Sequence, residues 1–350
     1  MKHVNIPVFI PHLGCPNGCV FCNQRTISGK HAFDLSAVPG EIETALSAVE
    51  AGTTVPTEVE IAFFGGSFTG INRDDMIFLL ETAQRYIDDG RVSSIRLSTR
   101  PDYIDDGILS ILGHYGVRDI ELGIQSLDDA VLTASQRGHT AACALRACYA
   151  VKRAGFRLIG QMMLGLPGST PEAETATARG ICEAGADGAR IYPTTVLQDT
   201  ELDAMTRAGE YLPLSLPEAI ERAVSVYEIF LAHDVPVIRC GLCASEELLG
   251  ETGITAGSYH SAFGELTASA LYLRRIRAAL DRCPPPPGAS LTIYCPKRSA
   301  SQVAGQKREN KMIIQNEYNV KNVKIIEKDN LLRYNIEIEY RPFPSRGDDE

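Results

Sequence analysis

The chain has 350 residues, 44% of them hydrophobic, which is enough to bury one large core or two unequal ones and excludes a disordered protein. Its N-terminus carries no export signal, and no run approaches the ~20 apolar residues that span a bilayer, so we expect a soluble, cytoplasmic protein with no membrane partner. The formal net charge of −10 argues against a protein that coats nucleic acid along its whole surface.

Short β-branched or apolar runs alternate with longer helical patterns from residue 35 to about 240, which indicates βα units around a parallel sheet. The predicted strands are Val4–Phe9, Val59–Phe64, Ser94–Ser98, Asp119–Gly123, Arg157–Met163, Ala189–Tyr192 and Pro236–Arg239. The predicted helices are Ser36–Glu50, Arg73–Tyr86, Ile104–His114, Thr140–Ala154, Pro171–Ala184 and Leu216–His233. Such units curl into an α/β fold, a partial or full (βα)6-type parallel barrel with its site at the carboxyl ends of the strands.

A proline-rich run at 284–288 cannot continue a helix and predicts a linker. We therefore expect a barrel with a helical cap region over 1–283, a small α+β module over 289–342, and a disordered tail over 343–350. The region from residue 286 onward holds 11 Lys/Arg and 9 Asp/Glu, so its charge is opposite in sign to that of the acidic remainder. The expected β-α-β-β elements of the module are Leu291–Tyr294, Ser299–Gln315, Val320–Ile326 and Leu332–Glu339.

Ten cysteines without an export signal are predicted to be reduced thiols, metal ligands or core residues. Three of them, Cys15, Cys19 and Cys22, form a C-x3-C-x2-C pattern in a Gly/Pro/Asn-rich loop directly after the first strand. Three ligands leave one iron of a 4Fe–4S cluster open for chemistry, whereas a structural site closes every position with protein ligands. The alternative is a zinc knuckle that takes His12 as its fourth ligand.

Glycines and polar side chains end the later strands, where a purely structural barrel favours apolar filling. Gly65, Gly66 and Ser67 end the second strand, and its two glycines let the backbone approach a ligand closely. Arg137 offers a fixed cation able to hold a carboxylate through two hydrogen bonds. The other candidate side chains at these strand ends are Ser98, Gln125, Gln161 and Arg190.

The cysteine pattern with Phe21 before its last member, the double-glycine strand end, and Gly123-Ile-Gln-Ser together resemble the radical S-adenosylmethionine (SAM) superfamily. A narrower resemblance, to the radical SAM half of the Elongator catalytic subunit, covers roughly residues 5–265. It rests on Ser98-Thr-Arg-Pro-Asp, Glu121-Leu-Gly-Ile-Gln-Ser, Arg137-Gly-His-Thr, Gly165-Leu-Pro-Gly, Arg190-Ile-Tyr-Pro and Arg239-Cys-Gly-Leu.

This resemblance implies that Cys15, Cys19 and Cys22 hold a 4Fe–4S cluster whose open iron binds SAM. A reducing electron donor then supplies an electron that breaks the S–C5′ bond and releases a 5′-deoxyadenosyl radical. The chemistry belongs to the cofactors, so the protein contributes binding, orientation and electrostatics.

The resemblance also implies the SAM contacts. Gly65–Ser67 receives the amino group, Gln125 and Arg137 approach the ribose and carboxylate, and Phe21 packs against the adenine. Arg190 belongs to the same expected set. Two further positions depart from the relatives, which often carry an acidic residue there: Ser98 and Gln161.

The Elongator subunit carries an acetyltransferase domain after its radical module, whereas about 60 residues follow the linker here, with no Gly-rich pyrophosphate loop. We therefore predict a SAM-cleaving enzyme that takes hydrogen from an unidentified substrate. One candidate substrate is a tRNA base, and the other is a small molecule such as a tetrapyrrole. The competing hypothesis is a non-catalytic, metal-stabilised RNA-binding protein.

Two weaker patterns lie outside the barrel motifs. The segment 297–311 holds five Lys/Arg and only Glu309 as an acid, which indicates either a tRNA-backbone contact or a solvated basic helix face. Within it, Gly305-Gln-Lys-Arg308 resembles the Gly-x-x-Gly loop with which KH modules clamp nucleotides, except that the second glycine is missing. The other pattern is an auxiliary-cluster candidate formed by Cys240 and Cys243 with Cys283 and Cys295.

Overall fold

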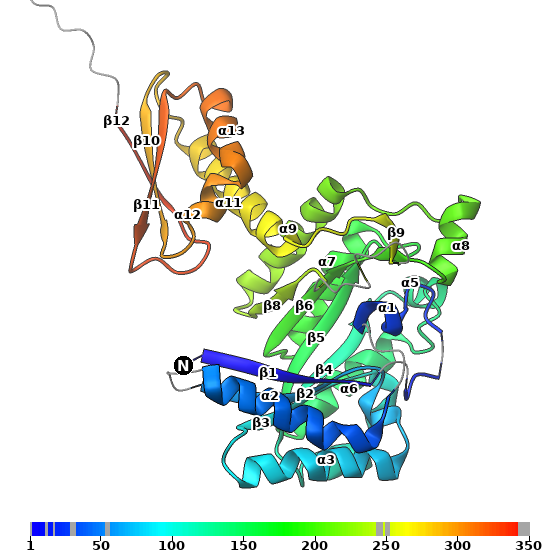
Figure 1. Ribbon diagram of the computed structural model, residues 1–350. Helices are drawn as coiled ribbons and strands as arrows, with labels where there is room; N and C mark the ends of the chain where they lie inside the picture. Colours follow the sequence, from blue (N-terminus) through cyan, green and yellow to red (C-terminus); the bar gives the residue numbers. More distant parts are fainter. Residues whose placement is uncertain are drawn as a thin grey trace, which may run out of the picture. The chain divides into compact units, whose positions relative to one another are not determined.

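The computed structural model describes residues 2–10, 13–16, 18–28, 33–52, 57–242, 248 and 253–341. The chain forms two compact units, residues 1–261 and 262–350 (Figure 1). Each unit has its own sheet and its own core.

The first unit is built on one curled sheet of seven parallel strands, in the spatial order β1-β2-β3-β4-β5-β6-β8 (Figure 1). Because successive strands are neighbours and all run the same way, their carboxyl ends meet at one rim. The partial barrel of the predicted α/β class is therefore confirmed. The strands are β1 (Lys2–Ile10), β2 (Thr57–Gly65), β3 (Ser94–Thr99), β4 (Val117–Gln125), β5 (Arg157–Leu164), β6 (Gly188–Pro193) and β8 (Val237–Cys240).

Helices connect the strands, and most of them begin at a residue whose side chain caps the first turn. Ser215 and Glu218 form a capping box, and Thr170 caps a helix whose first residue is Pro171. The α-helices are α1 (Gln24–Ser28), α2 (Val38–Gly52), α3 (Arg73–Asp88), α4 (Asp106–Leu112), α5 (Asp129–Ala134), α6 (Ala141–Arg153), α7 (Pro171–Glu183), α8 (Glu201–Ala208) and α9 (Leu216–Ala232). The short elements are the 3-10 turns η1 (Leu35–Ala37), η2 (Phe68–Gly70) and η3 (Pro101–Tyr103), and the antiparallel pair β7 (Thr195–Leu197) and β9 (Ile254–Gly257).

The two faces of the seven-stranded sheet have different chemistry. Apolar residues such as Ile61 and Ile120 are fully buried, while the positions next to them in β2 and β4 carry Glu60 and Glu121. Successive strand residues point to opposite faces, so one face packs in the apolar core and the other bears charged side chains. The structure thus places a polar interior inside the curl of the sheet.

The second unit packs three helices against a three-stranded sheet (Figure 1). Strand β10 (Ser290–Pro296) is central, parallel to β11 (Asn322–Lys328) and antiparallel to β12 (Glu337–Arg341). Helix α11 (Phe263–Arg282) precedes the sheet. The remaining elements are α12 (Ala300–Ala304), the 3-10 turn η4 (Gln306–Arg308) and α13 (Glu309–Glu317).

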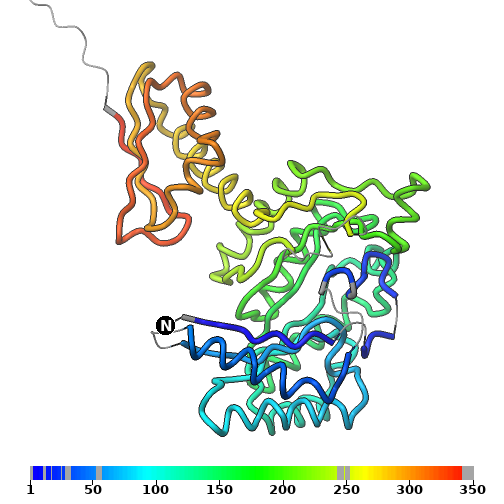
Figure 2. Tube along the Cα trace, in the orientation of Figure 1, coloured from blue at the N-terminus to red at the C-terminus, as the bar shows by residue number. Residues whose placement is uncertain are grey.

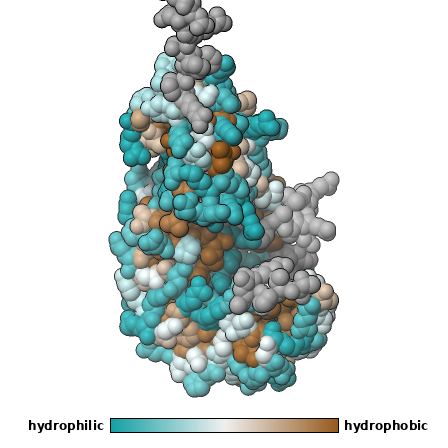
Figure 3. Space-filling model, turned by 90° about the vertical axis from the view of Figure 1, so that its left-hand side faces the viewer, coloured by the Kyte–Doolittle hydropathy of each residue, from teal (hydrophilic) through white to brown (hydrophobic). Residues whose placement is uncertain are grey.

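The helices cover one face of this sheet and leave the other hydrophilic. Leu291 and Ile293 of β10 are buried, while Tyr294 on the alternate face donates a hydrogen bond to Glu339 and lies under the Lys328 ammonium group. The part of Figure 3 that shows this unit is accordingly hydrophilic over most of its area.

The second unit departs from the sequence prediction in three places. Helix α11 belongs to it, because the Tyr272 hydroxyl accepts a hydrogen bond from the backbone N–H of Tyr334 and Arg277 pairs with Glu317; the proline-rich run at 284–288 therefore lies within the unit. The single predicted helix Ser299–Gln315 is wrong, because α12 ends at Gly305, where φ is 77°. Strand β12 begins five residues later than predicted, after turns. The tail at 343–350 lies outside the described residues.

Candidate active site

The three cysteines of the triplet follow β1, at the rim where the strands end. Cys19 is buried and Cys15 and Cys22 are half-buried, and the backbone N–H of Cys22 donates to the carbonyl of Cys19 at 3.0 Å. Besides burial, the Cys19 thiol raises the pKa of both Cys15 and Cys22, so the three lie close enough to interact electrostatically. No three His, Cys, Asp or Glu side chains of the described chain already stand in metal-coordinating positions, and the alternative ligand His12 lies outside it.

Two buried arginines face the thiol of Cys19. Arg137 Nη1 lies 3.3 Å from the Sγ atom, and Arg100 Nη1 lies 3.9 Å from it. Asp102 holds Arg100 through two hydrogen bonds of 2.9 Å, and Gly123 fixes Arg137 by accepting a 2.6 Å hydrogen bond from Nη2. The site therefore presents fixed positive charge to the sulfur atoms, which suits thiolates and an anionic cluster.

Burial opposes ionisation of the free thiols. Desolvation raises the pKa of Cys15, although the charges of Arg100 and Arg137 lower it in part. Desolvation also raises the pKa of Cys22, to about 12. Since a metal ion or cluster binds the thiolate and displaces the proton, binding here would be coupled to proton release.

The double-glycine end of β2 anchors the cysteine loop. Gly66 N donates to Ile10 O at 2.7 Å and Ser67 N donates to Leu13 O at 3.0 Å. A Cβ atom at Gly66 would lie 2.0 Å from Leu13 O, and one at Gly14 would lie 2.1 Å from Ser67 O. Only glycine permits this close approach of two backbones, so these glycines determine where the loop lies.

The side chain of Ser67 is turned toward β3. Its hydroxyl lies 2.8 Å from that of Thr99 and accepts from the backbone N–H of Arg100 at 3.2 Å. These hydrogen bonds fix the end of β3, which is followed by Arg100. The motif Ser98-Thr-Arg-Pro-Asp contains this arginine, but the sequence analysis assigned it no role.

Apolar packing holds the last turn of the cysteine loop. Val20 lies in a buried cluster with Val196, Leu202 and Tyr211, and Phe21 packs against that cluster. Backbone hydrogen bonds join Val20 to Ser135 and to Leu202, which bring the loop beside α5 and α8; Figure 2 shows this approach of the N-terminal trace to later segments. Phe21 is half-buried, so part of its side chain stays accessible beside this cluster.

Glu121 is a buried residue that positions candidate site residues and that sequence reasoning missed. It is 1% exposed and accepts from Arg96 at 3.0 Å, from Arg190 at 2.7 Å and from Ser98 at 3.2 Å. The predicted residues Ser98 and Arg190 are thus brought together through it. The pairing of β3 with β4 could have identified it, because this register places Glu121 beside Ser98 on the polar face of the sheet.

Several buried polar atoms have no hydrogen-bond partner among the described residues, and those on predicted site residues are Gln125 Oε1, Arg137 Nε and Arg190 Nε. Buried polar groups are normally paired, so unpaired ones indicate a polar ligand. Gln125 also has a left-handed backbone, with φ of 66°, which is uncommon for a residue with a Cβ and is concentrated at functional sites. Gln161 lies between Gly123 and Arg190 in the register of the same sheet.

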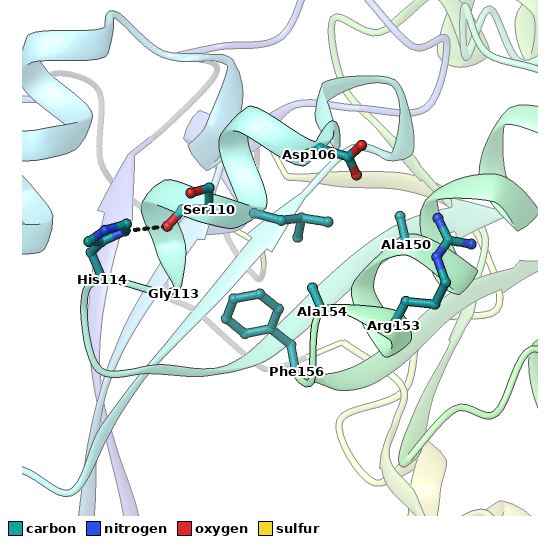
Figure 4. Close-up of a pocket in the computed structure, with 9 residues that line it drawn as sticks. Asp106, Ser110, Gly113, His114, Ala150, Arg153, Ala154 and Phe156 are labelled. Carbon is teal, nitrogen blue, oxygen red and sulfur yellow. Dashed lines mark hydrogen bonds between the residues drawn. The ribbon is translucent and has the colours of Figure 1, made fainter.

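Of the other cysteine candidates in the described chain, only Cys240 lies at a strand end of this rim. Cys283 and Cys295 belong to the second unit, Cys240 ends β8, and Cys243 lies outside the described residues. A cavity of about 480 Å³ is lined by α4, α6 and Phe156 (Figure 4). It lies beside the loops that enter β4 and β5, at the amino ends of the strands, where conserved chemistry is not expected in parallel barrels.

The basic segment 297–311 is not one helix face. Lys297 pairs with Asp329, while Lys307 and Arg308 occupy the turn between α12 and α13. Lys324, from β11, joins Arg308 in lining an open groove. No helix of the described chain has the length and apolar content needed to cross a membrane.

Comparison with known proteins agrees with this geometry. The model of the Radical SAM superfamily matches residues 9–179, and that of the Radical_SAM C-terminal domain matches residues 186–275. The tRNA uridine(34) acetyltransferase of Methanocaldococcus jannaschii is 33% identical over 147 residues, which cover 41% of this chain and 27% of that protein. The enzyme of the same name from Methanocaldococcus infernus is 28% identical over 209 residues, 58% of this chain and 38% of that protein. The chain thus spans about a quarter to two fifths of the length of these relatives.

A solved structure has the same fold. The archaeal Methanocaldococcus infernus Elp3 with an N-terminal deletion superposes with a TM-score of 0.62 at 21% identity, over 83% of this chain and 70% of that one. The resemblance predicted from the motifs is confirmed by these matches.

Proposed function

Because the chain belongs to the radical SAM superfamily, we propose that Cys15, Cys19 and Cys22 hold a 4Fe–4S cluster at which the chain cleaves SAM. Members of this superfamily use such a cluster together with SAM. When bound, the cluster and SAM would supply reductive cleavage of the S–C5′ bond by one electron. The products are methionine and a 5′-deoxyadenosyl radical that takes one hydrogen atom from a substrate. The electron comes from a reducing donor.

The observation that carries the proposal is the contact of Arg137 with the Cys19 sulfur at 3.3 Å, inside a buried rim. A guanidinium group beside a neutral thiol gains little, whereas beside a thiolate or an anionic cluster it forms a charge-assisted hydrogen bond. Arg100 adds a second positive charge on the same sulfur. These two residues would hold the cluster end of the site electrostatically.

The unpaired polar atoms support a second ligand at the same rim. Gln125 offers an acceptor and Arg190 offers a donor, both buried, which suits the hydroxyl and carboxylate groups of SAM. Gln161, Ser98 and the carbonyl groups of Gly65–Ser67 complete the proposed polar contacts. Phe21 would pack against the adenine.

The test is anaerobic reconstitution of the full chain with iron, sulfide, dithionite and SAM. We expect about four irons per chain and release of 5′-deoxyadenosine. The Cys22→Ala protein should bind less iron and release none. The matched control is Cys182→Ala, which removes a half-buried cysteine of α7 and should keep both properties.

A different result identifies the competing function. If the wild-type protein binds a single zinc ion and yields no 5′-deoxyadenosine, the chain is a metal-stabilised binding protein without catalysis. Retention of product by Cys22→Ala would contradict the proposed ligand set.

For the substrate we propose an RNA base. The support is that two relatives are named tRNA uridine(34) acetyltransferases and that the second unit exposes a basic groove. Mass spectrometry of total tRNA from a deletion strain should show a missing modification. An unchanged tRNA profile with an altered small-molecule pool, such as a tetrapyrrole intermediate, would favour the alternative substrate class.

A further inference from the structure

An open groove crosses the second unit between α12, the turn 305–308, α13 and β11. Its volume is about 430 Å³. Ala300 and Ala304 of α12 leave room on one side, and the strand forms the other. The residues that line it are Ala300, Ala304, Arg308, Lys311, Asn322, Val323, Lys324 and Ile325.

The turn at one end of this groove has a fixed and unusual backbone. Gly305, Lys307 and Arg308 all have positive φ, of 77°, 48° and 67°. A Cβ atom at Gly305 would lie 2.8 Å from Asn310 N. The Asn310 side chain is buried and donates to the carbonyl groups of Ser269 and Val303, which locks the turn.

Left-handed backbone at two consecutive long side chains costs conformational energy and persists where the surrounding structure imposes it. Here the result is that Arg308 lines the groove with Lys307 next to it in the turn. The conformation of the turn therefore fixes the backbone positions of two positively charged residues.

The cations of the groove are unpaired, unlike others in the same unit. Lys328 pairs with Glu337 and Arg277 pairs with Glu317. No carboxylate of the described residues pairs with the three cations that line the groove or with the cation beside them in the turn, although Glu309 lies nearby in sequence. The three that line it are Arg308, Lys311 and Lys324, and Lys307 precedes Arg308 in the turn.

The opposite wall offers a different kind of contact. Strand β11 is an edge strand, because the order of the sheet is β11-β10-β12. An edge strand carries backbone donors and acceptors on its free side. Ile325, which is half-buried, adds apolar surface beside them, while Val323 is buried in the core. One wall thus suits phosphate groups, and the other suits the edges and faces of bases.

We infer that this groove binds a single strand of nucleic acid, with its phosphates against Lys307, Arg308 and Lys311 and its bases along β11. Single strands are recognised through unstacked bases and backbone contacts, whereas a duplex hides its base edges. An acidic peptide would satisfy the cations but would leave the apolar part of the strand wall unused. The link to catalysis rests on the proposed function, but binding itself requires neither cluster nor SAM.

The test is fluorescence anisotropy of the full chain, without iron or SAM, against a single-stranded RNA of about twelve nucleotides. Single-stranded DNA of the same sequence, an RNA duplex and polyglutamate are the comparison ligands. We expect both single strands to bind, and the duplex and polyglutamate to bind at least tenfold more weakly. Four phosphate contacts predict a slope of log affinity against log salt of about −2.8.

The decisive variant is Lys307→Gln with Arg308→Gln. It should weaken single-strand binding about tenfold and reduce the slope to about −1.4, because two of the four contacts are removed. The matched control is Arg282→Gln with Arg333→Gln, which removes the same charge from exposed residues outside the groove and should change affinity less than twofold. Lys324→Gln alone should weaken binding about threefold, from the strand side.

Three results would overturn the inference: no binding by the wild-type protein, equal binding of the duplex or polyglutamate, or an equal loss in the control pair. Unchanged circular dichroism of each variant shows that the fold is intact. These binding measurements need no cluster, so they are independent of the reconstitution assay. Loss of RNA binding would contradict the groove inference alone, and failure to release 5′-deoxyadenosine would contradict the proposed function alone.

Discussion

The two units of the chain use charged side chains in opposite ways. Inside the curl of the first unit, Glu121 lies between Arg96 and Arg190, and all three are buried or nearly so. In the groove of the second unit, Arg308 is exposed and Lys311 is half-buried, and neither has a carboxylate partner in the described chain. The first arrangement satisfies its charges internally, while the second leaves them for a ligand.

This difference separates structural charges from binding charges. A buried charge must be paired because desolvation is expensive, so its removal should affect folding first. An exposed unpaired cation costs the fold little, so its removal should affect only binding. Between them stands Arg137, which is buried yet directed at a thiol, and which we propose as part of the cofactor site.

The largest effect is expected from Glu121→Ala. The change leaves Arg190 buried without a carboxylate, and removing one member of a buried ion pair costs about 3 kcal/mol or more. Urea unfolding followed by circular dichroism measures the loss. Glu50→Ala is the matched control, since Glu50 also binds an arginine, Arg91, but at the surface; its free energy of unfolding should hardly change. Equal effects in the two variants would contradict the distinction.

The second largest effect is a pH dependence that arises at the same rim. Burial, and then the charge of Arg137, lower the pKa of His139 from an ordinary 6.5 to about 4. The unfolded chain takes up this proton near pH 6.5 and the folded chain only near pH 4. Stability that is present above pH 6.5 is therefore lost as the pH falls to 4, by about 3 kcal/mol over that window.

His139→Gln should flatten this part of the stability curve, measured as unfolding free energy at several pH values. His233→Gln, at an exposed helix end, should keep it. An identical slope in wild type and His139→Gln would show that the acid sensitivity comes from other groups.

The sequence predicted the regular part of the first unit because each strand and helix leaves a local signal. The expected helix Pro171–Ala184 differs from α7 by one residue, since Thr170 and Pro171 mark its start chemically. The cysteine loop was placed correctly after β1. These features are determined by residues that are close together in the sequence, so they can be predicted without knowledge of tertiary contacts.

What the sequence did not predict depends on register and on backbone geometry. The role of Glu121 emerges only when β3, β4 and β6 lie side by side and bring Arg96 and Arg190 to it. The break at Gly305 was missed because Lys307 and Arg308 have good helix propensity, although both adopt left-handed conformations here. Tertiary contacts of Asn310 override that propensity.

A smaller effect should come from the turn of the second unit. Gly305→Ala should cost about 2 kcal/mol, because the new Cβ combines a strained backbone with a clash against Asn310. Gly288→Ala, which has a similar φ of 75° but open space around it, should cost about 1 kcal/mol. Thermal unfolding distinguishes the two. Equal costs would mean that the turn is not held by Asn310.

The smallest effect on stability is expected for the variant of the second unit that should weaken nucleic-acid binding most. Lys307→Gln with Arg308→Gln breaks no ion pair among the described residues, so the free energy of unfolding should change by about 0.5 kcal/mol or less. Relief of repulsion between adjacent cations would even favour a slight gain. A large loss of stability in this variant would show that the two cations stabilise the fold, as Glu121 does. The distinction between structural and binding charges, which supports the nucleic-acid groove, would then fail.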